Sequence, residues 1–286
     1  MRKTSYIIVF FLTIAIYGNG QSLITNGDFE NYSSLPTSFH QWYLSVGWNN
    51  ANGGVYGAGA TPDYWHTAGY IPYNMGLIWP NSGNGQMALV NYAGTVPNHR
   101  EYLCSQLITP LVVGQEYVLS FYLTNGSSGY NTARSDNFGV SFSVNTHAQD
   151  TFEVLQVTPQ IVIPGIVDIN NYWKKFTFNF IADSAANYIT FGNYKSDPNA
   201  TIINPSSTAY YFIDDVELHA ASPIEISGGS AMCQGDSITL EAINSMVQGW
   251  AESSSPNNII STDTVITVSP NVTTTYFVYS ANDTAS

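Results

Sequence analysis

The chain contains few charged residues and very few cations. Only 9% of its 286 residues are charged, and 7 Lys and Arg stand against 20 Asp and Glu, which gives a net charge of −13. A surface of this sign repels phosphate backbones, so we expect no nucleic-acid partner. The same balance suits an extracellular protein, a calcium-binding protein, or both.

Cysteine is also scarce. Cys104 and Cys233 lie far apart in the chain and fall in different predicted domains. We therefore favour two buried or half-buried thiols over a disulfide, and two cysteines are too few for a metal cluster.

Long apolar runs are missing except at the start, "MRKTSYIIVFFLTIAIYGNG". Arg2 and Lys3 precede an apolar stretch over 7–16, and small residues follow it. This pattern predicts a secretory signal over residues 1–20, cleaved before Gln21. The alternative, a retained N-terminal anchor helix, is disfavoured because the run is short for a membrane span. We expect a protein that is secreted or held at the bacterial cell surface, without a membrane span after cleavage.

The sequence offers no recognisable catalytic motif. It has no G-x-S-x-G elbow, no H-E-x-x-H and no phosphate-binding loop. Carboxylate pairs for glycoside cleavage could be drawn from Asp63, Glu101 and Asp136, but any acidic protein offers such pairs. We therefore predict a binding protein rather than an enzyme.

What the sequence does contain is one strand pattern after another. In "KFTFNF", Phe176, Phe178 and Phe180 share one face, and polar residues alternate with them. Turn sequences such as "VVGQ", "NGSSG" and "DSAAN" separate the segments, and no amphipathic helix is evident. The pattern predicts an all-β sandwich or barrel. The predicted strands span 86–92, 101–108, 116–124, 137–144, 172–181, 187–194 and 209–218.

A composition break at "HAASPIEISGGS" (219–230) predicts two domains, 21–220 and 224–286. The second part opens with C-x-G-D-S-x-T-L, closes with V-S-P-x-x-T-T-T-Y, and has Trp250 between two strand pairs. It resembles the small immunoglobulin-like repeats of bacterial secreted proteins, which implies a smaller β-sandwich. The chain ends soon afterwards, so either the last strand is short or the domain is incomplete.

The two ends of the first domain carry a second resemblance. "LITNGDFE" (23–30) and "YYFIDDVEL" (210–218) resemble the first and last strands of galactose-binding-like jelly rolls, found in many carbohydrate-binding modules. The resemblance implies a jelly-roll β-sandwich and a structural Ca²⁺ that ties the two ends together. It implies Glu30 and Asp214 as side-chain ligands, Asp28 as a backbone ligand and Asp215 as the next candidate. The alternative is that Asp28 and Asp215 are ordinary turn or edge residues.

A third resemblance spans residues 25–218, through "NGDFE", "TPDYWH", "HREYLCSQLITPLVVGQEYVLSFYLT" and "RSDNFGVSFS" in this order. This segment is similar to an N-terminal module of proteins that Gram-negative bacteria export by type IX secretion. In this chain no type IX sorting domain and no peptidoglycan-binding domain is recognisable.

The stretch "TPDYWHTAGYIPYNMGLIWP" (61–80) has five aromatic residues, one formal charge and no helical or strand period. We interpret it as a long functional loop, because such loops are uncommon without a role. Aromatic faces stack on sugar rings, so this stretch offers candidates for glycan contacts in Tyr64, Trp65, Tyr73 and Trp79. The candidate hydrogen-bond partners are Asp63, His66, Asn74 and Asn81. Two alternatives stay open: the loop packs on one sheet as an auxiliary core, or some rings are buried and one or two exposed.

The scarce cations suggest a polar cluster near this loop. Arg100 and Arg134 directly precede strands and lie beside Glu101 and Asp136 in sequence. We expect them to form one cluster with Asp63, which either clamps the loop or holds a polar ligand. The predicted ligand-binding set is Asp63, Tyr64, Trp65, His66, Trp79, Arg100, Arg134 and Asp136.

These observations predict a secreted, non-catalytic protein that binds a glycan or another cell-surface component, adhesin-like in character, with structural calcium. The alternative is a structural or protein-interaction surface module that binds no sugar.

Overall fold

The computed structural model describes residues 21–52, 60–126, 129–221, 225–228, 233, 236–243, 247–252, 259–272 and 274–280, so the predicted signal lies outside the described residues. Residues 21–220 form one compact unit, and the residues from 221 onward belong to a second. None of the described segments is a helix with the length and hydrophobicity that crossing a membrane requires.

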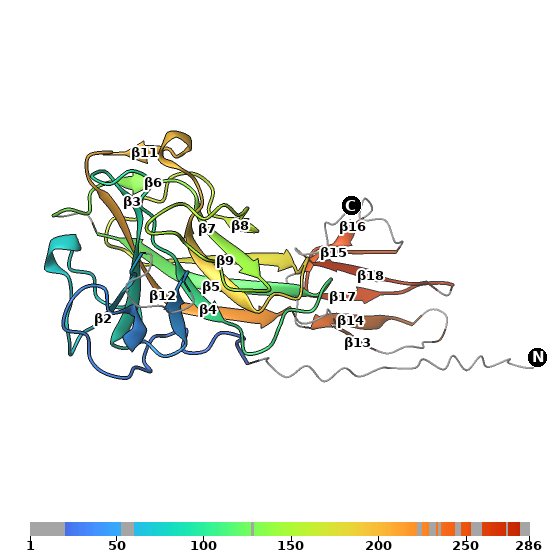
Figure 1. Ribbon diagram of the computed structural model, residues 1–286. Coiled ribbons are helices and arrows are strands. Elements are labelled where there is room, and N and C mark those ends of the chain that lie inside the picture. The colour runs from blue at the N-terminus through green and yellow to red at the C-terminus, as the bar shows by residue number, and fades with distance from the viewer. Residues whose placement is uncertain are drawn as a thin grey trace, which may run out of the picture. The chain divides into compact units, whose positions relative to one another are not determined.

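The first unit is an all-β jelly-roll sandwich of two five-stranded antiparallel sheets (Figure 1). One sheet has the order β1 (Trp48–Asn50), β4 (Leu103–Gln106), β10 (Tyr188–Asn193), β7 (Phe138–Ser143) and β8 (Ile161–Val162). The other, which we call the site sheet, has the order β2 (Asp63–His66), β3 (Gly85–Ala93), β12 (Thr208–Ala220), β5 (Glu116–Asn125) and β9 (Lys174–Ile181). β6 (Arg134–Ser135) and β11 (Ile202–Ile203) form a separate ribbon, and the 3-10 helices are η1 (Trp42–Leu44), η2 (Tyr73–Met75) and η3 (Asp197–Asn199).

Alternating side chains of the two sheets meet in one hydrophobic core. Phe121 of β5 packs edge-on against Phe191 of β10, with ring centroids 5.4 Å apart. Phe142 of β7 stacks on Phe180 of β9 at 4.4 Å. The predicted alternation of "KFTFNF" is confirmed, because Phe176, Phe178 and Phe180 pack against the core while their polar neighbours are exposed.

The N-terminal segment runs beside the last strand of this unit. The Leu23 amide donates to the Leu218 carbonyl at 2.7 Å, and the Val216 amide donates to the Gly27 carbonyl at 2.9 Å. A side chain at position 27 would place its Cβ 1.9 Å from the Val216 carbonyl oxygen, so only glycine allows this approach. The ends of the first domain therefore lie side by side.

The stretch 61–80 is not the continuous loop that we predicted from its lack of period. Residues 63–66 form edge strand β2, which pairs with β3 from Asp63↔Ala88 to His66↔Gly85. All four side chains are buried, because one face of the strand meets the main core and the other meets a second cluster. A strand buried on both faces has no polar alternation, which explains the missing period.

The rest of this stretch covers part of the outer face of the site sheet. Ile78, Tyr70 and Met75 belong to a smaller hydrophobic cluster that also contains Trp65 and Tyr210. This is the auxiliary core that we considered as an alternative. Tyr73 and Trp79 remain exposed, so the mixed alternative is the correct one.

The second unit contains two three-stranded antiparallel sheets around Trp250. Trp250 is fully buried, and its indole nitrogen donates to the Asp263 carbonyl at 2.8 Å. The likeness of this unit to immunoglobulin-like repeats stays a prediction. The sheets have the orders β13 (Glu225–Gly228), β14 (Ile238–Ile243), β17 (Val265–Val268) and β16 (Ile259–Ser261), β15 (Val247–Ala251), β18 (Phe277–Ser280).

The two cysteines lie in different environments. Cys104 is buried in β4, where burial raises the pKa of its thiol to about 11. Cys233 is exposed, which corrects our expectation that both thiols are at least half-buried.

Candidate functional site

Residues 79–82 cross the outer face of the site sheet, and we call them the crossing segment. The Trp173 indole, just before β9, donates to the Trp79 carbonyl at 2.8 Å. At the other end the Asn81 amide donates to the Asp214 carboxylate of β12 at 2.8 Å. Asp214 pairs with Tyr122 of β5, so the segment spans from β9 over β5 to β12. It separates the part of the face covered by the auxiliary core from a part that is open.

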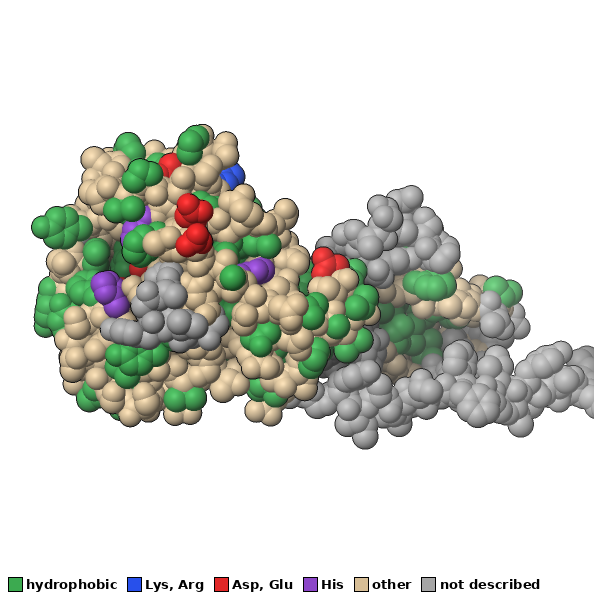
Figure 2. Space-filling model, in the orientation of Figure 1, with side chains coloured by type: hydrophobic (Ala, Val, Ile, Leu, Met, Phe, Trp, Pro, Cys, Tyr) green, Lys and Arg blue, Asp and Glu red, His purple; other side chains and the backbone are tan. Residues whose placement is uncertain are grey.

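Four exposed aromatic side chains gather beside this segment, and we call them the aromatic rim. They are Tyr73, Trp79, Tyr130 and Tyr172, which are 76%, 58%, 69% and 77% exposed. The Tyr130 amide donates to the Asn74 carbonyl at 3.0 Å, so the loop after β5 lies against η2. Figure 1 shows these two loops at the same end of the unit, and Figure 2 shows hydrophobic side chains protruding along that edge.

Trp79 is exposed although its backbone is firmly held. Its carbonyl accepts the Trp173 indole hydrogen, and Asn81 and Ser82 both donate backbone hydrogens to Asp214. The ring therefore projects from a fixed backbone position and is not part of the core. A pre-organised aromatic face of this kind binds a ligand at a low cost in conformational entropy.

The open face of the site sheet, next to the rim, is polar. Thr177 of β9 and Glu217 of β12 are exposed and lie at matching register positions on either side of Ser120 of β5. Hydroxyl and amide groups on a flat sheet face can bind hydroxyl-rich ligands through hydrogen bonds. The open face comprises Tyr122, Lys175, Thr177, Asn179 and Glu217.

The structure corrects most of the predicted ligand-binding set. Of its eight side chains only Trp79 is exposed, and the other seven are buried. Tyr64 and Trp65 are fully buried, so their faces are not available to a sugar. His66 is also buried, and burial lowers its pKa.

Asp63 lies in a buried hydrogen-bond network instead of at a ligand surface. Its carboxylate accepts hydrogen bonds from the Tyr210 hydroxyl and from the His40 amide, and Trp65 donates to the Tyr210 oxygen at 2.9 Å. Burial raises the pKa of Asp63 to about 7, although both hydrogen bonds act in the opposite direction. Burial and the nearby Asp63 also raise the pKa of Glu101, so two carboxyl groups interact here.

This network predicts a pH dependence of stability. A carboxyl group with a raised folded-state pKa stabilises the fold below its unfolded pKa, and the contribution is lost as pH rises through the folded value. We expect the free energy of unfolding to fall between pH ~4 and pH ~7, by at most about 4 kcal/mol from Asp63. Urea unfolding across this range should show a smaller fall for Asp63→Asn, and an unchanged slope in that variant would contradict the assignment.

The predicted polar cluster is divided in the structure. Arg100 is fully buried and pairs with Asp197 at 2.8 Å, not with the loop 61–80. Asp136 pairs with Lys195 at 2.8 Å, and the Lys195 carbonyl accepts a hydrogen bond from Arg100. Arg100 therefore has a structural role, because its charge is paired within the protein.

Arg134 belongs to a different site, where it pairs with Asp168 at 3.0 Å. Its guanidinium also donates to the Ala133 carbonyl at 2.7 Å, the Gly126 carbonyl at 2.9 Å and the Asn170 side chain at 3.0 Å. It thereby holds the loop that follows β5 and the loop that precedes β9, which carry Tyr130 and Tyr172 of the rim.

Two of the predicted calcium ligands engage one loop, residues 81–85. Glu30 accepts the backbone hydrogens of Asn84 and Gly85, each at 2.6 Å. Asp214 accepts those of Asn81 at 2.8 Å and Ser82 at 3.2 Å. Asp214 is fully buried and pairs with no cationic side chain in the described part of the chain. Burial and the neighbouring Asp215 raise its pKa to about 8, and hard carboxylate oxygens of this kind fit a calcium ion.

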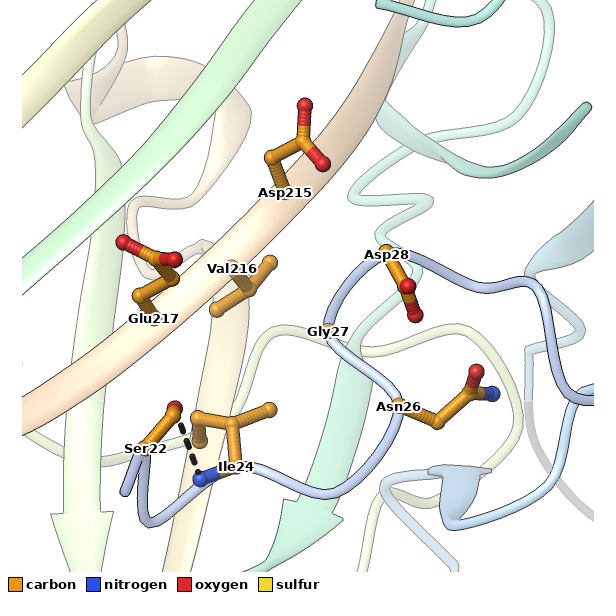
Figure 3. A pocket seen from close by; sticks show the side chains of 8 residues that line it. All are labelled: Ser22, Ile24, Asn26, Gly27, Asp28, Asp215, Val216 and Glu217. Carbon is orange, nitrogen blue, oxygen red and sulfur yellow. Dashed lines mark hydrogen bonds between the residues drawn. The ribbon is translucent and has the colours of Figure 1, made fainter. Parts of the chain in front are cut away.

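The other two candidates line a pocket of about 220 Å³ between the N-terminal segment and β12 (Figure 3). Figure 3 shows the side chains of Asp28, Asp215 and Glu217 around it. The Ser82 hydroxyl also donates a hydrogen bond to the Asp215 carboxylate at 2.7 Å. Within the described residues, no three side chains of His, Cys, Asp or Glu stand close enough to hold a metal ion by themselves, so backbone oxygens would have to complete a site.

Comparison with known proteins gives structural likeness only. No protein-family model and no curated protein matches the sequence. A cleaved adhesin domain of Lys-gingipain is similar with 16% identity and a TM-score of 0.38, over 68% of this chain and 96% of that one. TmCBM61, solved with beta-1,4-galactotriose, is 13% identical with a TM-score of 0.35, over 70% and 99% of the two chains. The enzymatically active domain of a bacteriophage tailspike protein is 12% identical with a TM-score of 0.36, over 70% and 21%.

Sequence reasoning found half of the rim, because Tyr73 and Trp79 belong to the aromatic stretch 61–80. It missed Tyr172, which stands at the start of the predicted strand 172–181, and Tyr130, which falls between two predicted strands. The signal that could have found Tyr172 is its place directly before the alternating strand pattern, where a core role is least expected.

Proposed function

We propose that the protein is a non-catalytic glycan-binding module, with the aromatic rim and the adjoining open face as its binding surface. The observation that carries this proposal is the exposed Trp79 ring on a backbone held at both ends. The sugar rings of a glycan have apolar faces that stack on aromatic rings, while their hydroxyls need hydrogen-bond partners. The rim offers aromatic rings for stacking, and the adjoining open face offers hydrogen-bond partners.

The arrangement favours an extended ligand over a small one. The rim draws its rings from three loops around the ends of β5 and β9, and the open face continues from there along three strands. A ligand that contacts both needs several linked units. We further propose that the protein works outside the cell, which rests on the predicted signal over residues 1–20.

A glycan-array screen of the purified protein tests this function. We expect binding to oligosaccharides or polysaccharides of several residues and little binding to monosaccharides. Absence of binding across the array, with a circular dichroism spectrum of folded β-sheet, would contradict the proposal. It would favour the alternative of a structural or protein-interaction module.

We also propose a structural calcium ion at Glu30 and Asp214. A buried carboxylate without a cationic partner is costly unless it is protonated or binds a cation. Calcium there would neutralise Asp214 and tie the segment 23–30, the loop 81–85 and β12 together. It would also anchor the crossing segment that carries Trp79.

Calcium is therefore expected to raise the melting temperature, and a chelator to lower it. At a hundredfold excess over Kd the gain corresponds to about 2.7 kcal/mol. The gain should grow as pH rises toward about 8, because calcium binds the ionised form of Asp214. Asp214→Asn should lose the response and the control Asp183→Asn, at an exposed turn, should keep it. An equal response in both variants would contradict the site.

A further inference from the structure

We propose that the binding surface selects acidic glycans, with carboxylate or sulfate groups bound by Lys174 and Lys175. This inference rests on the proposed function and adds the chemical class of the ligand. It starts from the five cations that follow residue 20, which are Arg100, Arg134, Lys174, Lys175 and Lys195.

Three of these five cations are neutralised by the protein itself. Arg100 pairs with Asp197, Arg134 pairs with Asp168, and Lys195 pairs with Asp136, all with N–O distances of 2.8–3.0 Å. Lys174 and Lys175 have no ion pair with any described carboxylate, although acids outnumber cations fourfold in this part of the sequence.

The two lysines instead lie over aromatic rings. The Lys174 ammonium is 5.0 Å from the Phe176 ring centroid, and the Lys175 ammonium is 5.7 Å from that of Tyr122. A cation–π contact holds an exposed ammonium in place and leaves its N–H groups free to bind an anion. Both side chains are exposed.

Lys175 lies on the surface proposed for the glycan, and Lys174 lies on the opposite side of its edge strand β9. Both residues directly follow Tyr172 and Trp173 at the start of β9, and Lys175 belongs to the open face beside Tyr122. Because successive residues of a strand point to opposite faces, the two ammonium groups flank the edge of the site sheet. An anionic chain across the rim would meet one lysine on each side of this edge.

The net charge of the protein makes this placement specific. A chain with a charge of −13 repels polyanions at long range, so non-specific attraction does not explain binding of an acidic glycan. Binding must come from local ion pairs at this surface, and added salt should weaken it.

Matched polymers test the inference. We would measure affinity for polygalacturonate and for its carboxyl-reduced, neutral form, and likewise for dextran sulfate and dextran. We expect at least one acidic polymer to bind about tenfold more tightly than its neutral counterpart at low salt, as a charge-assisted hydrogen bond would give. The two pairs distinguish carboxylate from sulfate recognition.

Substitutions assign the effect to the lysines. Lys175→Gln should lower affinity for the acidic polymer about five- to tenfold, and Lys174→Gln combined with it should abolish the preference. Lys195→Gln, which removes a lysine already paired with Asp136, should leave affinity unchanged.

Three results would overturn the inference. Equal binding of acidic and neutral polymers would leave the glycan-binding function intact but refute the acidic preference. Unchanged affinity with increased aggregation of Lys175→Gln would show that the lysines protect the edge strand β9 from pairing with other chains. Binding of no polymer and no array glycan would refute the proposed function as well.

Discussion

Replacing Arg134 with methionine is expected to lower the free energy of unfolding by about 3–5 kcal/mol, because the change breaks a buried, fully bonded charge site. The Arg134 side chain is 5% exposed and donates to backbone carbonyls of Gly126 and Ala133 as well as to two side chains. Methionine fills a similar volume but donates no hydrogen bond. The buried carbonyls would then be unsatisfied, at a cost of about 1–3 kcal/mol for each group.

Urea denaturation of the purified protein measures this loss. Lys195→Met is the control, since its ion pair with Asp136 is 39% exposed on the lysine side and such pairs contribute about 0–1 kcal/mol. A loss below about 1 kcal/mol for Arg134→Met would contradict the structural role that we assign. A secondary effect on glycan affinity is also expected, because Arg134 positions the loops of Tyr130 and Tyr172.

Replacing Trp79 with alanine is expected to lower glycan affinity at least about tenfold, since central aromatic contacts dominate binding surfaces. Stability should change little, because the ring is 58% exposed and the bonds that hold the segment involve backbone atoms of residues 79–82. The two effects together distinguish a ligand-binding ring from a packing ring.

Tyr43→Ala is the matched control for this variant. Tyr43 is an aromatic residue that is 44% exposed in η1, an element that contacts β1 and β2. Its replacement should leave affinity within about twofold of wild type. Equal losses for the two variants, or none for Trp79→Ala, would place the glycan elsewhere.

The sequence predicted the strands that have one buried and one exposed face. Phe176, Phe178 and Phe180 alternate with polar residues because β9 is an edge strand with an open outer face, and the pattern records this directly. All seven predicted segments match strands within two residues at each end. β2 was missed because its two faces are both buried, which removes the alternation on which strand prediction depends.

The site was harder to predict, since exposure of an aromatic ring is a tertiary property. Trp65 and Trp79 occur in the same aromatic stretch, but one is fully buried and the other is exposed. The difference arises from the crossing segment, whose position depends on Asp214 more than 130 residues further along the chain. The pairing of Arg100 with Asp197 is likewise long-range, so neighbouring charges such as Glu101 and Asp136 were misleading.

The central claim is that glycan meets the protein at the rim, and tryptophan NMR tests it directly. The protein has six tryptophans, of which Trp42, Trp48, Trp65 and Trp250 are buried. We would label the indole nitrogens and titrate the glycan that binds best in the array. The indole signals of Trp79 and Trp173 should shift with ligand concentration, while the other four stay in place. Shifts confined to the four buried tryptophans, or no shift during saturable binding, would contradict the account.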